Sequence, residues 1–585
     1  MPYTNPILAG SNPDPSIIRV GKDYFLTTST FEYTPSAPIY HSTDLIKWAL
    51  IGHALTRPSQ LTIQTPEPGG GVWATTLRYH KGVFYITAAS FTRYRPQDDD
   101  RVWPRGFVVR TRDIWDESSW SEPVWFDAVG FDQDLFFDDD GTVYLSSTYR
   151  KHPRTTVPAG SPALKDFAIH ICTIDIETGT ATSPSRLIRS SDSGVSEGSH
   201  IFKRNGLYYL FTAEGGTESG HCEWVFRSEK GPFGPWEVGP RNPLWRNGVH
   251  DEVQNTGHAD FVEDQHGEWW AVLLGVRPVW REDGEGGRWE GSVFGRETFL
   301  VPVTWENDWP VINSGNKITL TIDTPHLYHY TPPISWFDDF TSQTMQMGWY
   351  RKNTPLKKDY TILPLSSLPE NASWKAGLRL HGAPYTLSSP ACPTLFLRKQ
   401  ESRSCLWETK LRFSPTLENA EAGTAVYLNY FTHVSIGLRL APDSQGDEEV
   451  EKRRIVQFTA TAPKRNSSAA TLSPTLTLSN SAPLHSHTSD VLLYIECGDS
   501  YRFGFKEILD AEPDSEPITW FSSIPNSILT EAPLPIGAPF TGIMLGLYSC
   551  GDRQAVLEPA DFEFVRVREV GLDTISTEIQ GEASE

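Results

Sequence analysis

The chain has 585 residues, too many for a single hydrophobic core, so we expect at least two domains. Its net charge of −22 and isoelectric point near 5.2 argue against a nucleic acid or an anionic membrane as a partner, because phosphate groups require a basic surface. Aromatic residues make up 12% of the chain and include 20 Trp. We assign most of them to the core of a β-rich protein and a few to platforms for the apolar face of a sugar.

The N-terminal residues MPYTNPILAG are not a charged and then apolar leader, and no long apolar run follows. The sequence therefore predicts neither a signal peptide nor a membrane span, and we expect a cytoplasmic protein. A mature secreted form with an added Met would look the same. The six cysteines lack CxxC or His/Cys ligand spacing, so they are expected to be buried thiols rather than zinc ligands. An isolated disulfide remains open.

A turn of the Gly or Asp-Gly type, followed by an aromatic strand, occurs five times at intervals of about 60 residues. The copies begin at Gly21, Lys81, Asp140, Asn205 and His266. Each repeat reads as four short strands bounded by Gly, Pro, Asn and Asp, and long helical periodicity is nearly absent. Tandem units of this kind predict an all-β protein in which residues 1–321 form a five-bladed β-propeller.

Each repeat also has a side chain suited to a polar site, roughly ten residues before its aromatic pair. These residues are Asp14, Trp73, Asp132, Glu197 and His258. One such residue at a similar offset in every repeat predicts that the inner strands of the blades aim these side chains at a common axis.

The repeat ends before a Pro-punctuated segment, which we predict to be a linker at residues 322–335. Residues 336–575 contain alternating strands, for example those that start at Leu378, Ser404 and Gly423. This pattern favours a β-sandwich domain of the jelly-roll-like kind. The polar end of the chain, residues 576–585, is expected to be a frayed tail.

A central cavity lined by carboxylates and Trp, without a metal cluster or a nucleophilic Ser or Cys motif, indicates cleavage of a glycosidic bond. That reaction requires a protonated carboxylic acid for the leaving oxygen and a carboxylate that activates water or attacks the sugar. Side chains from different blades could face each other across an axial pocket with room for a water molecule.

Three segments of the sequence resemble glycoside hydrolase family 43, in its branch of β-xylosidases and α-L-arabinofuranosidases. They are NPILAGSNPDPSIIRVGKDYFLTTSTF, GFDQDLFFDDDGTVYL and SEGSHIFKRNGLYYLFTAEGG. The resemblance implies that Asp14 is the general base, that Asp132 orients the acid and tunes its pKa, and that Glu197 is the general acid.

Other segments extend the resemblance along the propeller. It implies that Trp73 stacks on the sugar, that Arg296 binds substrate, and that Phe31 belongs to the pocket wall. It also implies that His258 lies at the axis, where in some members a histidine helps to hold a hydrated calcium ion. No cofactor is expected otherwise. The segments DDFTSQTMQMGWYRKN and LFLRKQESRSCLWETKLRF are similar to the C-terminal sandwich attached to many such enzymes.

The sequence departs from the family pattern in two places. Thr75 stands where many relatives have Pro, and Asp134 stands where many have Ser or another small residue. Residues two apart on a strand point to the same side, so Asp134 could also face the cavity. The motif alignment favours Asp132.

The resemblance implies an inverting, exo-acting hydrolase that removes a terminal pentose, α-L-arabinofuranose or β-D-xylose, from arabinoxylan or xylo-oligosaccharides. A retaining fructan or sucrose hydrolase is a rival interpretation, but the Asn-Asp-Pro-Asn-Gly and Arg-Asp-Pro segments of that class do not occur. A non-catalytic, sugar-binding propeller is a second rival. It would be expected to lose the acid or the base, and this chain has both. The preferred pentose, the oligomeric state and any contact of the second domain with substrate stay open.

Overall fold

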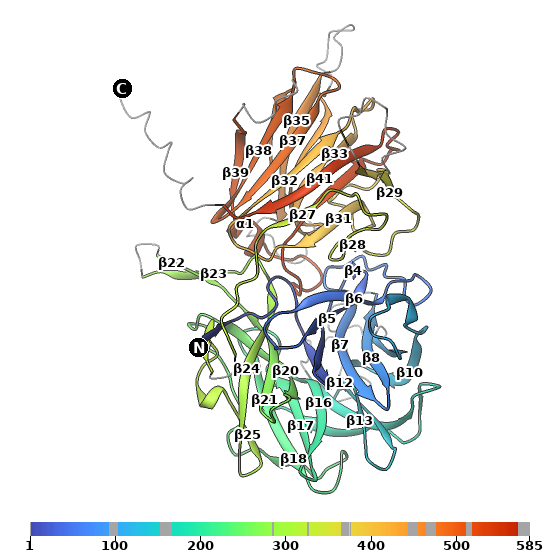
Figure 1. Cartoon of the computed structure of the whole chain (residues 1–585), viewed down its shortest axis with the longest axis vertical. Coiled ribbons are helices and arrows are strands. Elements are labelled where there is room, and N and C mark those ends of the chain that lie inside the picture. Colours follow the sequence, from blue (N-terminus) through green and yellow to red (C-terminus); the bar gives the residue numbers. More distant parts are fainter. Residues whose placement is uncertain are drawn as a thin grey trace, which may run out of the picture.

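The computed structural model describes residues 2–92, 103–151, 166–282, 286–324, 327–363, 374, 376–442, 453–463, 475–509 and 517–570. It confirms the predicted all-β fold, with a five-bladed propeller followed by a β-sandwich (Figure 1). Among the described residues no helix is long and apolar enough to cross a membrane. The predicted polar tail at 576–585 lies outside the described residues.

Five antiparallel sheets form the blades, and the first strand of each sheet is the inner one. The second strand carries the aromatic pair, for example Tyr24 and Phe25 in blade 1. Blade 3 differs from the prediction because a fifth strand pairs with its third. The strands are β2 (Ser16–Val20), β3 (Asp23–Thr27), β5 (Ser36–Ser42) and β6 (Ala49–Leu55); β7 (Gly71–His80), β8 (Val83–Phe91), β9 (Arg105–Thr111) and β10 (Val124–Val129); β11 (Phe131–Phe137), β12 (Val143–Arg150), β13 (Phe167–Asp175), β14 (Thr180–Ala181) and β15 (Arg186–Ser190); β16 (Ser196–Arg204), β17 (Leu207–Glu214), β18 (Cys222–Ser228) and β19 (Glu237–Val238); β20 (Gln254–Glu263), β21 (Trp269–Val276), β24 (Arg296–Glu306) and β25 (Trp309–Ile312).

The N-terminal segment closes the ring of blades. Strand β1 (Pro2–Thr4) pairs with β26 (Thr321–Asp323), which follows blade 5 in the sequence. Leu8 then forms a bridge with Thr298 of β24, so the chain enters blade 1 from the edge of blade 5. Aromatic and aliphatic side chains fill the space between the blades and bury the repeat's aromatic pairs to different degrees. A hairpin of β22 (Val279–Arg281) and β23 (Arg288–Glu290) extends from blade 5 toward the sandwich.

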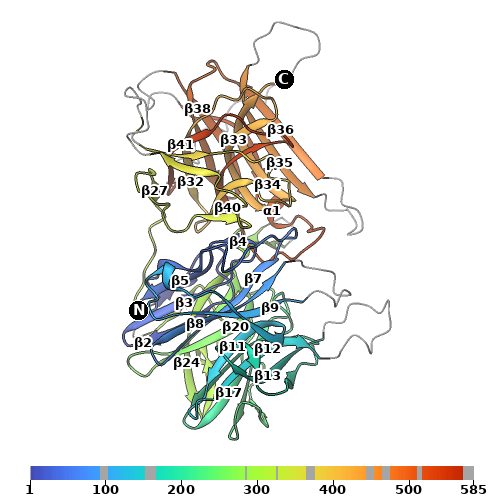
Figure 2. The same ribbon diagram turned by 90° about the vertical axis from the view of Figure 1, so that its right-hand side faces the viewer.

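The second domain consists of two facing eight-stranded antiparallel sheets around one large apolar core (Figure 2). One sheet contains β27 (Trp336–Asp338), β29 (Tyr360–Leu363), β30 (Gly377–Leu380), β32 (Cys405–Arg412), β37 (Asp490–Cys497), β38 (Ser500–Ile508), β39 (Thr519–Pro525) and β41 (Ala560–Arg568). The other contains β4 (Tyr33–Thr34), β28 (Tyr350–Lys352), β31 (Thr394–Lys399), β33 (Ala420–Asn429), β34 (Thr432–Leu440), β35 (Arg454–Pro463), β36 (Thr475–Pro483) and β40 (Met544–Gly551). The helical elements are short: η1 (Glu117–Ser119), η3 (Asn313–Gly315) and α1 (Ser527–Thr530).

Strand β4 joins the two domains, because it belongs to the propeller in sequence but pairs with β28 of the sandwich. It immediately follows Phe31 and Glu32, so the sandwich sheet reaches the rim of the propeller axis (Figure 1). All six cysteines are free, and five of them are buried. The expectation of thiols is therefore confirmed, and the isolated disulfide is not formed.

Candidate active site

One residue at the start of each inner strand has a left-handed backbone. The five are Asp14 (φ 54°), Ala74 (44°), Asp132 (52°), Gly198 (57°) and His258 (54°). In blades 2 to 5 the pairing with the second strand shifts register at this residue. A bulge of this kind bends the strand and re-aims its side chains, and such strained residues cluster at functional sites. The five blades therefore share one left-handed position, and in blades 2 to 5 it lies at a bulge of the inner strand.

In two blades the predicted polar residue is not itself the left-handed one. Trp73 and Glu197 each stand one residue before the left-handed position, which Ala74 and Gly198 occupy. Gly198 is required there, since an added Cβ would lie 2.6 Å from Cδ2 of His258. The close approach brings blade 4 against blade 5 and places Glu197 beside the axis.

Asp14 is buried, and its carboxyl contacts three side chains from different parts of the propeller. Its Oδ1 lies 3.2 Å from Nη1 of Arg296 and 3.3 Å from Nδ1 of His258. Its Oδ2 accepts a hydrogen bond of 2.7 Å from the hydroxyl of Ser29. Burial alone would raise the pKa of Asp14, but these three partners together hold it well below its ordinary value. Asp14 is therefore a carboxylate across the neutral range.

Asp132 and Glu197 form a second group of carboxyls, and their pKa values shift in the direction opposite to that of Asp14. Burial raises the pKa of Asp132, the charge of His258 opposes that rise, and Asp14 adds to it. Burial, followed by the charge of Asp132, raises the pKa of Glu197 to about 8. Oδ2 of Asp132 accepts a hydrogen bond of 2.9 Å from the backbone N–H of Gly198, next to Glu197. Within the described part of the chain, no protein group hydrogen-bonds the Glu197 carboxyl.

His258 does not fit the calcium ion that the family resemblance implies. Burial lowers its pKa, but Asp14 and Asp132 outweigh this effect and raise the pKa of His258 to about 9. The Nδ1 atom of His258 is also paired with Oδ1 of Asp14, at 3.3 Å. Among the residues that the structure describes, no group of three or more His, Cys, Asp or Glu side chains could hold a metal. His258 is instead a partner of Asp14 in the structure.

Five aromatic rings form one cluster with Trp73 at its centre. The Trp73 ring makes edge contacts with Phe91, Phe131 and Phe540, at centroid distances of 4.9, 5.8 and 5.7 Å. Phe31 packs on Phe540 at 5.3 Å. The wall that sequence reasoning assigned to Trp73 and Phe31 thus includes Phe540, which comes from the sandwich domain.

Arg296 lies between two aromatic rings, with its guanidinium carbon 5.3 Å from the ring centre of Phe31 and 5.1 Å from that of Phe540. Its Nη2 donates to the carbonyl oxygen of Phe540 at 3.2 Å, and its Nη1 donates to the hydroxyl of Thr217 at 3.0 Å. Its buried Nε has no hydrogen-bond partner among the residues that the structure describes. A buried donor without a partner is costly, so Arg296 offers an N–H to a ligand hydroxyl.

The sandwich makes two further contacts behind the site. Nζ of Lys399 donates to Oδ1 of Asn12 at 2.6 Å, two residues before Asp14. The Lys399 side chain also lines a small cavity between the domains, together with Phe31 and Thr541. Burial lowers the pKa of Lys399 to about 7. This contact links the second domain to the turn that presents Asp14.

A second chain of contacts from the sandwich supports Trp73. The indole N–H of Trp73 donates to the carbonyl oxygen of Gly69 at 2.7 Å. The loop around Gly69 is held by Asn353, whose Nδ2 donates to Thr65 at 3.1 Å, and by Ala538, whose N–H donates to Pro68 at 2.9 Å. The orientation of Trp73 therefore depends on both domains.

Sequence reasoning missed three residues near these groups: Phe540, Lys399 and Glu223. Glu223 is fully buried beside blade 5, and burial raises its pKa to about 8. Its Oε2 accepts a hydrogen bond of 3.2 Å from the N–H of Ala259, next to His258. The one usable sequence signal for Glu223 is a carboxyl residue beside the apolar run Trp224–Phe226 of β18. Phe540 and Lys399 belong to no repeat or motif.

Asp132 and Asp134, the two candidates for one role, have different partners in the structure. Both side chains face the axis, but Oδ1 of Asp134 lies 2.8 Å from Nε of Arg78, deeper in the propeller. Asp134 is thus committed to an ion pair, whereas Asp132 adjoins Glu197. Thr75, the other departure, is buried and shares a hydrogen bond of 3.1 Å with Thr27 of blade 1.

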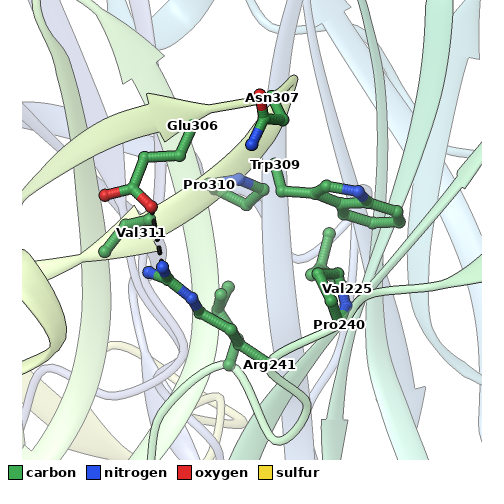
Figure 3. A pocket seen from close by; sticks show the side chains of 9 residues that line it. Val225, Pro240, Arg241, Glu306, Asn307, Trp309, Pro310 and Val311 are labelled. Atoms are coloured by element: carbon green, nitrogen blue, oxygen red, sulfur yellow. Dashed lines mark hydrogen bonds and ion pairs between the residues drawn. The ribbon is translucent and has the colours of Figure 1, made fainter.

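Figure 3 shows a separate pocket between the outer strands of blades 4 and 5. Its two charged side chains, Arg241 and Glu306, pair with each other at 2.7 Å. The pocket contains none of the residues at the axis, and its one carboxylate is already neutralised. It is lined by Val225, Pro240, Arg241, Leu244, Glu306, Asn307, Trp309, Pro310 and Val311.

Comparison with known proteins agrees with this arrangement over both domains. The family model described as glycosyl hydrolases family 43 matches residues 3–310, and the model described as the beta xylosidase C-terminal concanavalin A-like domain matches residues 337–568. The chain is 33% identical to a non-reducing end α-L-arabinofuranosidase of Bacteroides ovatus, over 97% of this chain and 94% of that protein. It is 28% identical to a beta-xylosidase of Bacillus subtilis, over 97% of this chain and all of that one.

Solved structures extend the same comparison. The crystal structure of a xylan beta-1,4-xylosidase from Bacillus halodurans superposes with a TM-score of 0.79 and 28% identity, and it covers 97% of this chain and 100% of that chain. The structure titled Bacteroides ovatus xyloglucan PUL GH43B superposes with a TM-score of 0.78 and 30% identity, with the same coverage. The propeller, the sandwich and the matched sequence together show that this chain is a glycosidase and belongs to glycosyl hydrolase family 43.

Proposed function

We propose that the protein is an exo-acting, inverting glycosidase that removes a terminal pentose, α-L-arabinofuranose or β-D-xylose, from xylan-derived oligosaccharides. The observation that carries the proposal is the contrast between two carboxyls in one site. The pKa of Asp14 is held below its ordinary value by Arg296 and His258 against the effect of burial, whereas burial and Asp132 raise the pKa of Glu197 to about 8. Such a pair provides a base and an acid at the same neutral pH.

Each residue then has one role in a single displacement. The Asp14 carboxylate takes a proton from water as the water attacks the anomeric carbon. The Glu197 carboxyl donates its proton to the glycosidic oxygen as the bond to the leaving group breaks. Asp132 keeps Glu197 protonated through like charge and fixes the adjacent backbone through Gly198. Arg296 donates from its free Nε to a sugar hydroxyl, and Trp73, Phe31 and Phe540 pack against the sugar ring.

The pentose class is supported by the relatives and by the aromatic side chains of the site. The two relatives that match nearly the whole chain are named as an α-L-arabinofuranosidase and a beta-xylosidase. β-D-Xylopyranose and α-L-arabinofuranose place similar hydroxyls in space. One wall made of the aromatic side chains Trp73, Phe31 and Phe540 therefore suits both. Aromatic rings pack on the C–H faces of either sugar without selecting between them.

A panel of four substrates tests the proposal: an aryl β-D-xyloside, an aryl α-L-arabinofuranoside, xylobiose and arabinoxylan. We expect release of free xylose, free arabinose or both, with no longer fragments from arabinoxylan. Release of internal oligosaccharides would contradict the exo mode. Absence of hydrolysis on all four, with retained sugar binding, would instead support a sugar-binding propeller.

A further inference from the structure

The propeller axis beneath the carboxyls is filled by one arginine. Arg78 extends from the inner strand β7, and its guanidinium reaches the inner strands of all four other blades. Nε lies 2.8 Å from Asp134, Nη1 lies 2.8 Å from Asp260 and 3.3 Å from Ser16, and Nη2 lies 3.0 Å from His200. We call these five residues the axial layer. Only a group on the axis can contact all five blades.

Residues of the axial layer lie two positions after residues of the proposed reaction, on the same inner strands. Ser16, Asp134 and Asp260 stand two residues after Asp14, Asp132 and His258 on the same strands. His200 stands two residues after Gly198, and its ring stacks on that of His258 at 5.8 Å. The position of each axial residue therefore sets the position of the bulge residue above it.

The donors and acceptors of the axial layer match a guanidinium. Arg78 also donates to the carbonyl oxygen of Leu77 at 2.9 Å, and Asp260 accepts from the hydroxyl of Ser16 at 2.6 Å. The acceptors lie in different directions in the plane of a rigid fork, which a lysine ammonium cannot reproduce. Calcium would require six to eight oxygen ligands at shorter distances, and part of this set is nitrogen.

The charges of the layer explain why a cation is needed there. Asp134 and Asp260 are both buried. Burial would raise the pKa of Asp260, but Arg78 and His200 outweigh it and lower the pKa to about 2. Without Arg78, both buried carboxylates would lose the guanidinium that pairs with them, and breaking a buried ion pair in this way is strongly unfavourable. A buried ion-pair cluster adds little net stability, and its best-attested use is to fix one geometry.

We propose that Arg78 is a positioning residue that takes the place of an axial metal ion and, through the five inner strands, holds Asp14, Asp132 and His258 in register for the reaction. This inference rests on the proposed function. Arg78 touches neither Asp14 nor Glu197 in the contacts that the structure describes, so its effect on the reaction passes through the strands.

The test compares Arg78→Lys and Arg78→Met with the wild type on an aryl glycoside that the wild type cleaves. A displacement of about 1 Å in a catalytic group can cost about 100-fold in rate, so we expect Arg78→Met to lose about 100-fold in kcat and Arg78→Lys about tenfold. KM should change less than about threefold, because the sugar contacts of Trp73, Phe31 and Arg296 are elsewhere. Arg110→Lys in β9 of the same blade, where the arginine pairs with exposed Glu177, is the matched control and should retain wild-type kcat.

A chelation experiment tests whether Arg78 or a metal ion occupies the propeller axis. Dialysis of the wild-type protein against EDTA, followed by addition of CaCl2, should change neither kcat nor the unfolding temperature. A loss of either on chelation, restored by calcium, would overturn the proposal. So would a folded Arg78→Lys protein with wild-type kcat, even if its unfolding temperature were lower, because that result indicates a purely structural role. If Arg78→Met does not fold, Arg78→Lys decides alone.

A wild type that cleaves no glycoside refutes the proposed function. The unfolding temperatures with and without calcium still test whether a metal occupies the axis.

Discussion

The propeller and the sandwich contribute to the same site in different ways. The propeller supplies the carboxyls Asp14, Asp132 and Glu197, each from an inner strand or the turn before it. The sandwich supplies an aromatic ring and a carbonyl oxygen from Phe540, and a hydrogen bond from Lys399. Chemistry and support are thus divided between domains, and the two kinds of contribution should differ in how they depend on the leaving group of the substrate.

The largest effect is expected for Glu197→Gln, which removes the proton donor of the propeller. General acid catalysis contributes about 10² to 10⁴-fold, so hydrolysis of xylobiose should fall by about 10³-fold. An aryl glycoside with a good leaving group needs little protonation and should lose far less. Steady-state rates on both substrates measure the difference. Glu237→Gln, an exposed position in the same blade, is the control, and equal losses on both substrates would remove Glu197 from the acid role.

A smaller loss is expected for Phe540→Ala in the sandwich. The change removes the ring that packs on Trp73, Phe31 and Arg296, so the sugar is held less well and kcat/KM should fall by about 10 to 100-fold. The loss should be the same for good and poor leaving groups, because Phe540 transfers no proton. Phe337→Ala, at an exposed ring of the same domain, is the matched control. A larger loss for poor leaving groups than for good ones in Phe540→Ala would contradict the view that only the propeller takes part in proton transfer.

Lys399→Met should have a still smaller effect. Met fills the space of the lysine stem but cannot donate to Asn12, and one hydrogen bond is worth about 0.5–1.5 kcal/mol, or up to about tenfold in rate. We expect kcat to fall within this range while the KM for the aryl glycoside stays close to that of the wild type. Lys358→Met, at an exposed lysine of the sandwich, controls for the loss of a charge. Unchanged kcat would show that the second domain does not support the Asp14 turn.

The smallest effect is a displacement of the pH profile. Glu197 must be protonated to act, so kcat/KM should fall as the pH rises through about 8, the pKa to which burial and Asp132 raise this residue. In Asp132→Asn the neighbouring negative charge is lost and deprotonation of Glu197 becomes easier. The alkaline limb should then move to lower pH, by about one unit. Phe540→Ala should leave this limb in place, since the sandwich change removes no charge. A shift in both variants would contradict the assignment.

The repeat made much of the propeller predictable from the sequence. The aromatic pairs mark the second strands, and the polar residues ahead of them lead to Asp14, Asp132 and His258 at the axis. In two blades the predicted residues, Trp73 and Glu197, stand one position before the left-handed residue. The left-handed position there is held by Ala74 and Gly198, whose side chains carry no polar group that a reader of the sequence could notice.

The remaining parts of the site depend on contacts between distant segments. Arg78 lies on an inner strand but off the repeat's polar position, so only the folded ring shows that its guanidinium reaches Asp134 and Asp260 from other blades. Phe540 belongs to a loop of the second domain that carries no motif. Its role follows from the pairing of β4 with β28, which brings the sandwich to the propeller rim.

The anomeric configuration of the first-formed sugar tests the central claim most directly. Proton NMR during cleavage of an aryl β-D-xyloside, or its arabinofuranoside counterpart if only that is cleaved, records this anomer before mutarotation. With Asp14 delivering water from the face opposite Glu197, the β-xyloside should release α-xylose first. Release of β-xylose first would mean retention through a covalent intermediate, and it would contradict the roles given to Asp14 and Glu197.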